Sequence, residues 1–183
     1  MTSTKEDARD QPIREFSECH GGIVHELHNL AALSLQEYPI QQRREIASRI
    51  LKFFQEVVTA HHVEEEGELF PAVLADATSG EERGKVESLI NQLVGEHRCA
   101  EARYAQISPV LKVIERGGDA SLDAATVDAL IADYLAHARF EEEVFLPLAQ
   151  TVLGRNGDHM AALGLALHIR HASDEVRQRF GYI

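Results

Sequence analysis

The chain has 183 residues, which is enough for one domain to bury a sizeable core without disulfides or a structural metal. Its formal net charge of −12 argues against nucleic acid or an anionic membrane as a partner, because both are bound by clustered Lys and Arg. No apolar run approaches the ~20 residues that span a bilayer, and the polar N-terminus carries no secretory signal, so we expect a cytoplasmic protein.

Apolar residues recur with helical spacing through almost the whole chain, without a convincing alternating strand pattern. Residues 1–14 are polar and are predicted to form a disordered lead-in. A first helix is predicted over residues 15–37, ending before Pro39. A second helix is predicted over residues 41–77, in which Pro71 causes a kink or interrupts one hydrogen bond.

Glycines and capping residues delimit the helices that follow. A third helix is predicted over residues 82–116, and the pair at 117–118 ends it, because both residues are glycines. A fourth helix, capped by Ser121 or Asp123, is predicted to continue to about Leu153.

A fifth helix is predicted over residues 158–180. Four long helices joined by short loops pack as antiparallel neighbours, so residues 15–153 are predicted to form an up-down-up-down four-helix bundle. Residues 154–183 are predicted to pack on one side or one end of this bundle as a C-terminal helix. The sequence therefore predicts a single all-α domain.

The second helix carries a stretch that recurs later in the chain. When the sequence is shifted by 76 positions, AHHVEEEGELFP falls on AHARFEEEVFLP. His61 and Glu65 then land on His137 and Glu141, and each pair belongs to one continuous helix face that also carries apolar residues. The neighbouring His62 has no histidine counterpart, so the repeat favours His61 as the functional residue.

The preceding helices repeat as well, because a shift of 77 positions places His20 on His97. Each half of the chain is thus predicted to form one helical hairpin, with a histidine on its first helix and His-x-x-x-Glu on its second. At ~1.5 Å rise per residue, these residues lie at matching depths from the turns. We therefore expect six residues in one layer: His20, His61, Glu65, His97, His137 and Glu141.

Four imidazoles and two carboxylates in one buried layer predict a metal site. Desolvating two unpartnered carboxylates costs several kcal/mol each, and no Lys or Arg lies on the same helix faces. Six mixed donors exceed the ligands of one tetrahedral zinc and suit iron best, with manganese or zinc as substitutes. Taken singly, each such histidine is more often a core or surface residue, so the prediction rests on the repeated arrangement.

This arrangement resembles the hemerythrin-like (HHE cation-binding) family. The resemblance rests on the two upstream histidines, the two His-x-x-x-Glu pairs and the Glu-x-x-Leu-Phe-Pro run, and it covers about residues 16–148. It implies a non-haem di-iron centre in a four-helix bundle, with two carboxylates bridging the irons beside an oxo or hydroxo group. The implied ligands are Glu65 and Glu141 as bridges, His20 and His61 on one iron, and His97 and His137 on the other.

One position departs from the family pattern. Oxygen-carrying hemerythrins have a fifth histidine one turn after the histidine of the third helix, and this chain has Glu101 there. Glu101 matches Val24 in the internal repeat, so it is predicted to project near the core, as a seventh ligand or as an uncoordinated acid. The resemblance then points away from an oxygen carrier with one saturated iron, and toward di-iron proteins linked to nitric oxide stress and iron-centre repair.

The remaining histidines and both cysteines lack this support. His25 and His28 match alanines in the second half and are predicted to be surface residues. For His28, the alternative is a contact that orients a metal ligand. Cys19 and Cys99 are predicted to be free thiols, either inert and buried or sensitive to oxidation. The fifth helix carries three more histidines without a carboxylate pattern: His159, His168 and His171.

The sequence leaves three classes of function open. The first is a binding or sensing protein whose di-iron site takes O₂ or NO, or which handles iron. The second is an oxidase or peroxidase acting on peroxide or a reductant, in which Glu101, Tyr104 or Tyr134 would transfer protons or electrons. The third is a metal-free structural bundle. In each case the fifth helix could also pack against a second copy of the chain and form a homodimer.

Overall fold

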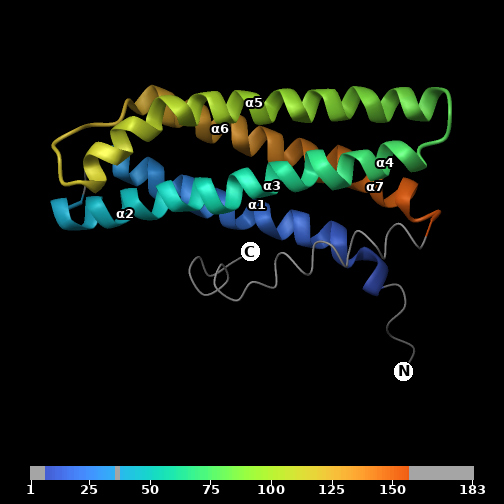
Figure 1. Ribbon diagram of the computed structural model, residues 1–183, viewed down its shortest axis with the longest axis horizontal. Coiled ribbons are helices and arrows are strands. Elements are labelled where there is room, and N and C mark those ends of the chain that lie inside the picture. Colours follow the sequence, from blue (N-terminus) through green and yellow to red (C-terminus); the bar gives the residue numbers. More distant parts are fainter. Residues whose placement is uncertain (1–6, 36–37, 157–183) are drawn as a thin grey trace. The chain divides into compact units, whose positions relative to one another are not determined.

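The computed structural model describes the backbone of residues 7–35 and 38–156, and the side chains of residues 20–35 and 38–156. Within these residues the chain is helical and has no strand. In chain order the elements are α1 Asp7–Ser34, α2 Ile40–Phe53, η1 Phe54–Val58, α3 Thr59–Glu64, η2 Glu65–Leu69, α4 Phe70–Asp76, α5 Glu81–Glu115, α6 Ala124–Phe140, η3 Glu141–Phe145 and α7 Leu146–Leu153 (Figure 1). The three η elements are single π-helical turns, each set inside a longer helical stretch.

The prediction of an all-helical fold is confirmed for the described residues. The stretch from α2 to α4 is continuous over Ile40–Asp76, one residue from each predicted end. The first helix differs, because it begins at Asp7, within the segment predicted to be disordered. The predicted fifth helix, residues 158–180, lies outside the described residues.

Local signals account for the ends of α5 and the start of α6. The backbone N–H and the hydroxyl of Thr78 both donate to Glu82 Oε2 at 2.7 Å, just where α5 begins. Gly117 follows the end of α5 with a φ of +83°, a conformation that glycine adopts without strain. The Thr126 N–H donates to Asp123 Oδ2 at 2.9 Å, so Asp123 is the cap of α6.

The helices divide into two compact units. Unit 1 contains residues 1–22, 61–94 and 138–183, and unit 2 contains residues 23–60 and 95–137. Each unit therefore contains a segment of every long helical stretch. Within the described residues, none of the helices has a segment long and apolar enough to cross a bilayer.

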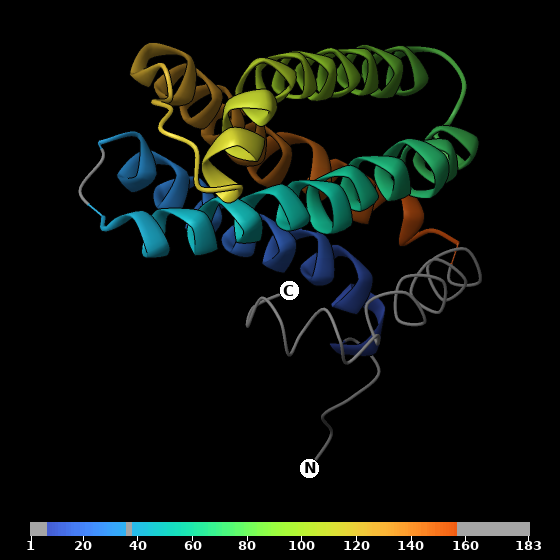
Figure 2. The same ribbon diagram turned by 60° about the vertical axis from the view of Figure 1, so that its left-hand side comes forward.

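The core of unit 1 lies where α4 packs beside α7 (Figures 1 and 2). The Phe70 and Phe145 rings meet edge to face here, with centroids 5.1 Å apart. Arg155, just after α7, donates to both carboxylate oxygens of Glu82, at 2.8 and 2.6 Å. The buried core residues are Leu69, Phe70, Val73, Ala77, Val86, Leu93, Phe145, Leu146, Ala149, Val152 and Leu153.

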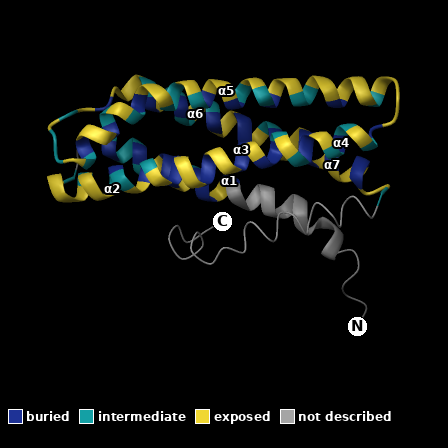
Figure 3. Ribbon diagram, viewed as in Figure 1, coloured by how far each residue is buried: buried dark blue, intermediate teal, exposed yellow. Residues whose placement is uncertain are grey.

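The core of unit 2 is made by α1, α2, η1, α5 and α6. Buried and exposed residues alternate along α2 and α5, as expected for helices with one apolar face (Figure 3). One buried charge, Glu26, is paired with Arg49 and accepts from Asn29 at 3.2 Å. The fully buried apolar residues of this unit include Ile23, Leu30, Ala47, Ile50, Leu111, Val127 and Leu130.

Candidate metal centre

Four of the predicted ligands come together in unit 1. They are His20 from α1, His61 from α3, Glu65 at the start of η2 and Glu141 at the start of η3. Each offers one ligand atom, and these four atoms all lie within 4.8 Å of one another. All four side chains are buried, and both glutamates are completely so. The structure therefore assembles a compact group of two imidazoles and two carboxylates.

The ligand atoms of this group lie at short distances. His61 Nε2 is 3.1 Å from His20 Nε2 and 3.0 Å from Glu65 Oε1. His20 Nε2 is 3.3 Å from Glu141 Oε2. Two donor atoms about 2.1 Å from one ion, at right angles to each other, are about 3.0 Å apart. The observed spacings therefore suit coordination of a common cation.

The two glutamates repel each other in the absence of a cation. Burial raises the pKa of Glu65 well above its usual range, and the neighbouring Glu141 charge and a hydrogen bond to Glu141 raise it further. A bound cation would favour the ionised form of these carboxyl groups, which fits this donor set to a metal.

Each ring nitrogen of His20 contacts a glutamate. Its Nδ1 lies 3.2 Å from Glu142 Oε1 and donates to it, because a carboxylate can only accept. Burial alone would lower the pKa of His20, but hydrogen bonds to Glu141 and Glu142 outweigh burial and raise it to about 9. In the neutral ring, the contact with Glu142 leaves Nε2 as the nitrogen that can coordinate a metal.

Both glutamate ligands begin a π-helical turn. In η2 and in η3, the glutamate carbonyl accepts from the N–H five residues further on. Pro71 and Pro147 follow directly after these bonds. Proline has no N–H, and its ring crowds the carbonyl four residues earlier, so a wider turn relieves the crowding. The predicted effect of Pro71 is thus a π turn that places Glu65, and the same holds for Glu141.

The other two predicted histidine ligands lie in unit 2. His97 on α5 and His137 on α6 are both buried, with ring centroids 4.8 Å apart. His137 Nδ1 is 3.1 Å from Glu96 Oε2 and donates to it, the same arrangement as at His20. Tyr134 is also buried, and its ring centroid lies 5.6 Å from that of His137.

Glu101 is not a member of the ligand group in unit 1. Its side chain is 42% exposed, and its carboxylate oxygens each accept from Arg98 at 3.0 Å. The charge three residues earlier on α5 holds the carboxylate along the helix surface. The role of Glu101 as a seventh ligand or an uncoordinated acid stays a prediction.

His62, which has no histidine counterpart in the repeat, is also buried. Its side chain is as buried as that of His61, and the two ring centroids are 6.1 Å apart. The matching residue in the second copy, Ala138, is also buried. A small apolar residue at the matching position is therefore the sequence signal that position 62 faces inward. Glu96 and Glu142 gave no such signal, because their histidine partners lie on other helices.

The remaining histidines and cysteines that the sequence singled out are exposed or have side chains outside the described residues. His25 and His28 are exposed, as predicted. Cys99 is exposed as well, so it is not the buried thiol that was one alternative, and its Sγ lies 3.4 Å from Asp133 Oδ2. The side chains of Cys19, His159, His168 and His171 lie outside the described residues.

Comparison with known proteins gives one match. The chain matches the family model described as the hemerythrin HHE cation binding domain, over residues 11–149. Comparisons with curated proteins and with solved structures gave no match.

Proposed function

Because the chain belongs to the hemerythrin HHE cation-binding family, we propose that it is a non-haem di-iron protein that binds or senses O₂ or NO, or handles iron. The observation that carries this proposal is the buried group of His20, His61, Glu65 and Glu141, whose ligand atoms lie within 4.8 Å of one another. The function would be of the stress-response or iron-centre-repair type.

The proposed centre uses six ligands, with Glu101 as a candidate seventh. When bound, the iron ions would supply redox-active positions for a diatomic ligand or peroxide. Manganese or zinc could take the same donors. Glu65 and Glu141 would each bind both ions, His20 and His61 would hold one ion, and His97 and His137 would hold the other.

The residues around the ligands have two tasks in this proposal. Glu142 and Glu96 accept hydrogen bonds from Nδ1 of His20 and His137, which fixes each ring with Nε2 available for coordination. Burial of the donors excludes bulk water, which strengthens their interaction with a cation.

We also propose the finer architecture that the sequence predicts. Residues 15–153 would form an up-down-up-down four-helix bundle, and residues 154–183 would pack on it as a further helix. The cytoplasmic location and the homodimer stay predictions.

An enzymatic function is the alternative, and one observation favours it. Tyr134 is 1% exposed and lies next to His137, so a phenol that can transfer an electron or a proton contacts a proposed ligand. Turnover of peroxide or of a reductant by the iron-loaded protein would support an oxidase or peroxidase, whereas stoichiometric binding of O₂ or NO without turnover would support the sensor.

The decisive experiment is metal analysis with a UV-visible spectrum of protein produced in iron-replete medium. Wild type should contain about two irons per chain, as carboxylate-histidine centres in helical bundles do, with near-ultraviolet absorption. Glu65→Ala and Glu141→Gln should lose both. The control is Glu143→Gln, an exposed residue in the same π turn as Glu141, which should retain iron.

Substoichiometric metal that is unchanged in Glu65→Ala would contradict the proposal. The repeat would then be a duplicated hairpin only, and the metal-free structural bundle would be the remaining function. If the irons are confirmed, titration with O₂, NO and peroxide identifies the ligand.

A further inference from the structure

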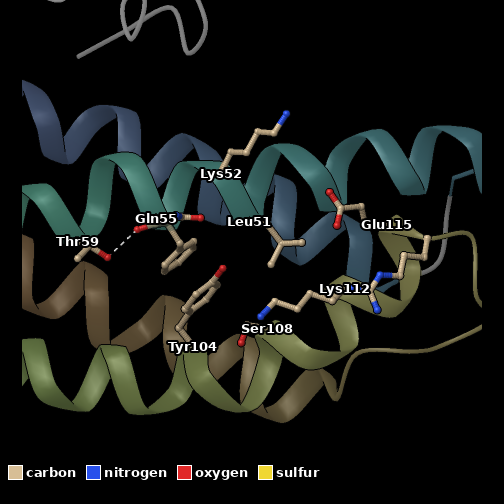
Figure 4. Close-up of a pocket in the computed structure, with 10 residues that line it drawn as sticks. Leu51, Lys52, Gln55, Thr59, Tyr104, Ser108, Lys112 and Glu115 are labelled. Carbon is tan, nitrogen blue, oxygen red and sulfur yellow. Dashed lines mark hydrogen bonds between the residues drawn. The ribbon is translucent and has the colours of Figure 1, made fainter.

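Unit 2 contains a pocket of about 530 Å³ that the proposed metal chemistry does not use. One wall carries Leu51, Gln55 and Thr59, and the facing wall carries Tyr104, Ser108 and Lys112 from α5 (Figure 4). On each wall these residues are four positions apart, so each set lies along one face of its helix. The volume is within the range of small-molecule sites and far above that of a single inorganic anion.

The charge of the pocket is opposite to that of the chain. Lys52, Lys112 and Arg116 line it against one carboxylate, Glu115. The whole chain has 18 basic and 30 acidic residues, so three cations around one cavity are a local reversal. A cavity with an excess of positive charge attracts anions.

Two aromatic rings, one from each wall, meet at the pocket. The ring of Tyr104 from α5 stacks on that of Phe54 from η1, with centroids 3.9 Å apart and planes within 3°. In Figure 4 the Tyr104 hydroxyl points toward the opposite wall of the pocket. Burial raises the pKa of Tyr104 to about 12, so the hydroxyl is a hydrogen-bond donor at neutral pH. The pair offers an aromatic surface together with a polar edge.

The backbone at the pocket is also unusual. The π turn η1 contributes Phe54 and Gln55 to the lining, and neither a proline nor a proposed metal ligand lies within it. Thr59 closes this turn, because its hydroxyl donates to the Phe54 carbonyl at 3.0 Å (Figure 4). Single π turns in longer helices occur frequently at functional sites.

We propose that this pocket binds a small organic anion in which a planar ring is attached to a carboxylate or a phosphate group. The ring stacks against Tyr104, and the anionic group accepts hydrogen bonds from Lys112, Ser108 and Arg116. The two anionic groups share this chemistry, so the probes must distinguish them.

The test is isothermal titration calorimetry of the full chain with 2-naphthoate and, separately, with adenosine monophosphate. At least one probe should bind, and Lys112→Met and Tyr104→Leu should each weaken it about tenfold, the size expected for one charged hydrogen bond or one aromatic contact. Lys85→Met is the control, since Lys85 is an exposed lysine on α5 outside the pocket, and it should bind as wild type does.

Binding of 2-naphthoate alone identifies the carboxylate as the preferred group, and binding of the nucleotide alone identifies the phosphate. The neutral 2-naphthalenemethanol tests the charge, and equal binding of this alcohol would overturn the proposal. So would unchanged affinity in Lys112→Met, or the failure of both probes to bind at millimolar concentration. Circular dichroism of each variant shows that a loss of binding is not a loss of folding.

Discussion

The two copies of the repeated helix agree in backbone at their proposed glutamate ligands and differ one turn before their histidines. At Glu65 and at Glu141 a π turn begins, and a proline follows six residues later in both copies. Earlier in the first copy, Phe54–Val58 forms the π turn η1. The matching residues 130–134 belong to the regular helix α6. The copies therefore share one π turn, which is η2 in the first copy and η3 in the second, whereas η1 belongs to the first copy alone.

The difference shows that a π turn can have two causes. The shared turns precede a proline, whose missing N–H and bulky ring disfavour a regular helix at that point. The unshared turn has no proline, and it coincides with the stacking of Phe54 on Tyr104 and with the hydroxyl contact of Thr59. In the second copy Leu135 takes the place of Thr59 and has no hydroxyl to donate.

The largest expected effect tests whether the copies are equivalent in the core. Leu69 and Phe145 occupy matching positions, and both are fully buried in unit 1. Phe145→Ala should lower the free energy of unfolding by about 3–5 kcal/mol, and Leu69→Ala by about 2–5 kcal/mol, because each leaves a cavity. Urea denaturation measures both changes. A loss below 1 kcal/mol at either site would show that the two copies do not pack alike.

The second-largest expected effect compares Glu142 with Glu143, its neighbour in the π turn η3. Glu142→Ala removes the acceptor that holds Nδ1 of His20, so iron affinity should fall about 10–100-fold. Competition with a chelator of known affinity measures this change. Glu143→Ala, at an exposed position, is the matched control. Equal affinities in the two variants would show that Glu142 does not orient His20.

A smaller effect tests the cause of the unshared π turn. Thr59→Val keeps the shape of the side chain and removes its donation to the Phe54 carbonyl, so it should cost about 0.5–1 kcal/mol of unfolding free energy. Thr151→Val is the control, because Thr151 donates in the same way to the Pro147 carbonyl at 2.9 Å in a regular turn, and it should cost less because that contact is exposed whereas the Thr59 contact is half-buried. If the two variants lose the same stability, the hydroxyl has no special role in η1.

The smallest expected effect concerns Glu82, which lies outside both copies of the repeated helix. The Arg155 guanidinium, and then Thr78, hold the pKa of Glu82 well below its ordinary value of 4.5. Glu82 therefore contributes stability above that value, and the contribution is lost as the pH falls toward the folded-state pKa. The contribution is small because Glu82 pairs at the surface.

The check is urea unfolding of wild type and Glu82→Gln between about pH 6 and pH 3. Stability of the wild type should fall more steeply with acid than that of the variant. Glu81→Gln, its exposed neighbour, should follow the wild type. Parallel curves for wild type and Glu82→Gln would contradict the assignment.

Much of this architecture was predictable because its signals are local. Gly117 and Asp123 mark the end of α5 and the cap of α6 through backbone conformation and a hydrogen bond three residues away. The repeated spacing of histidines and glutamates also predicted which side chains are buried, since a helix face is a property of sequence period. His61, Glu65, His137 and Glu141 are all buried.

The sequence by itself thus determined the helical class of the described residues, the ends of most of their helices and the burial of the six proposed ligands. Only the tertiary structure decided which residues meet across helices: Glu142 with His20, 122 positions apart, and Tyr104 with Phe54. It also placed Glu101 against Arg98 at the surface and turned His62 inward. The physical reason is that side-chain partners on other helices depend on helix rotation, which packing and π turns set after the local structure has formed.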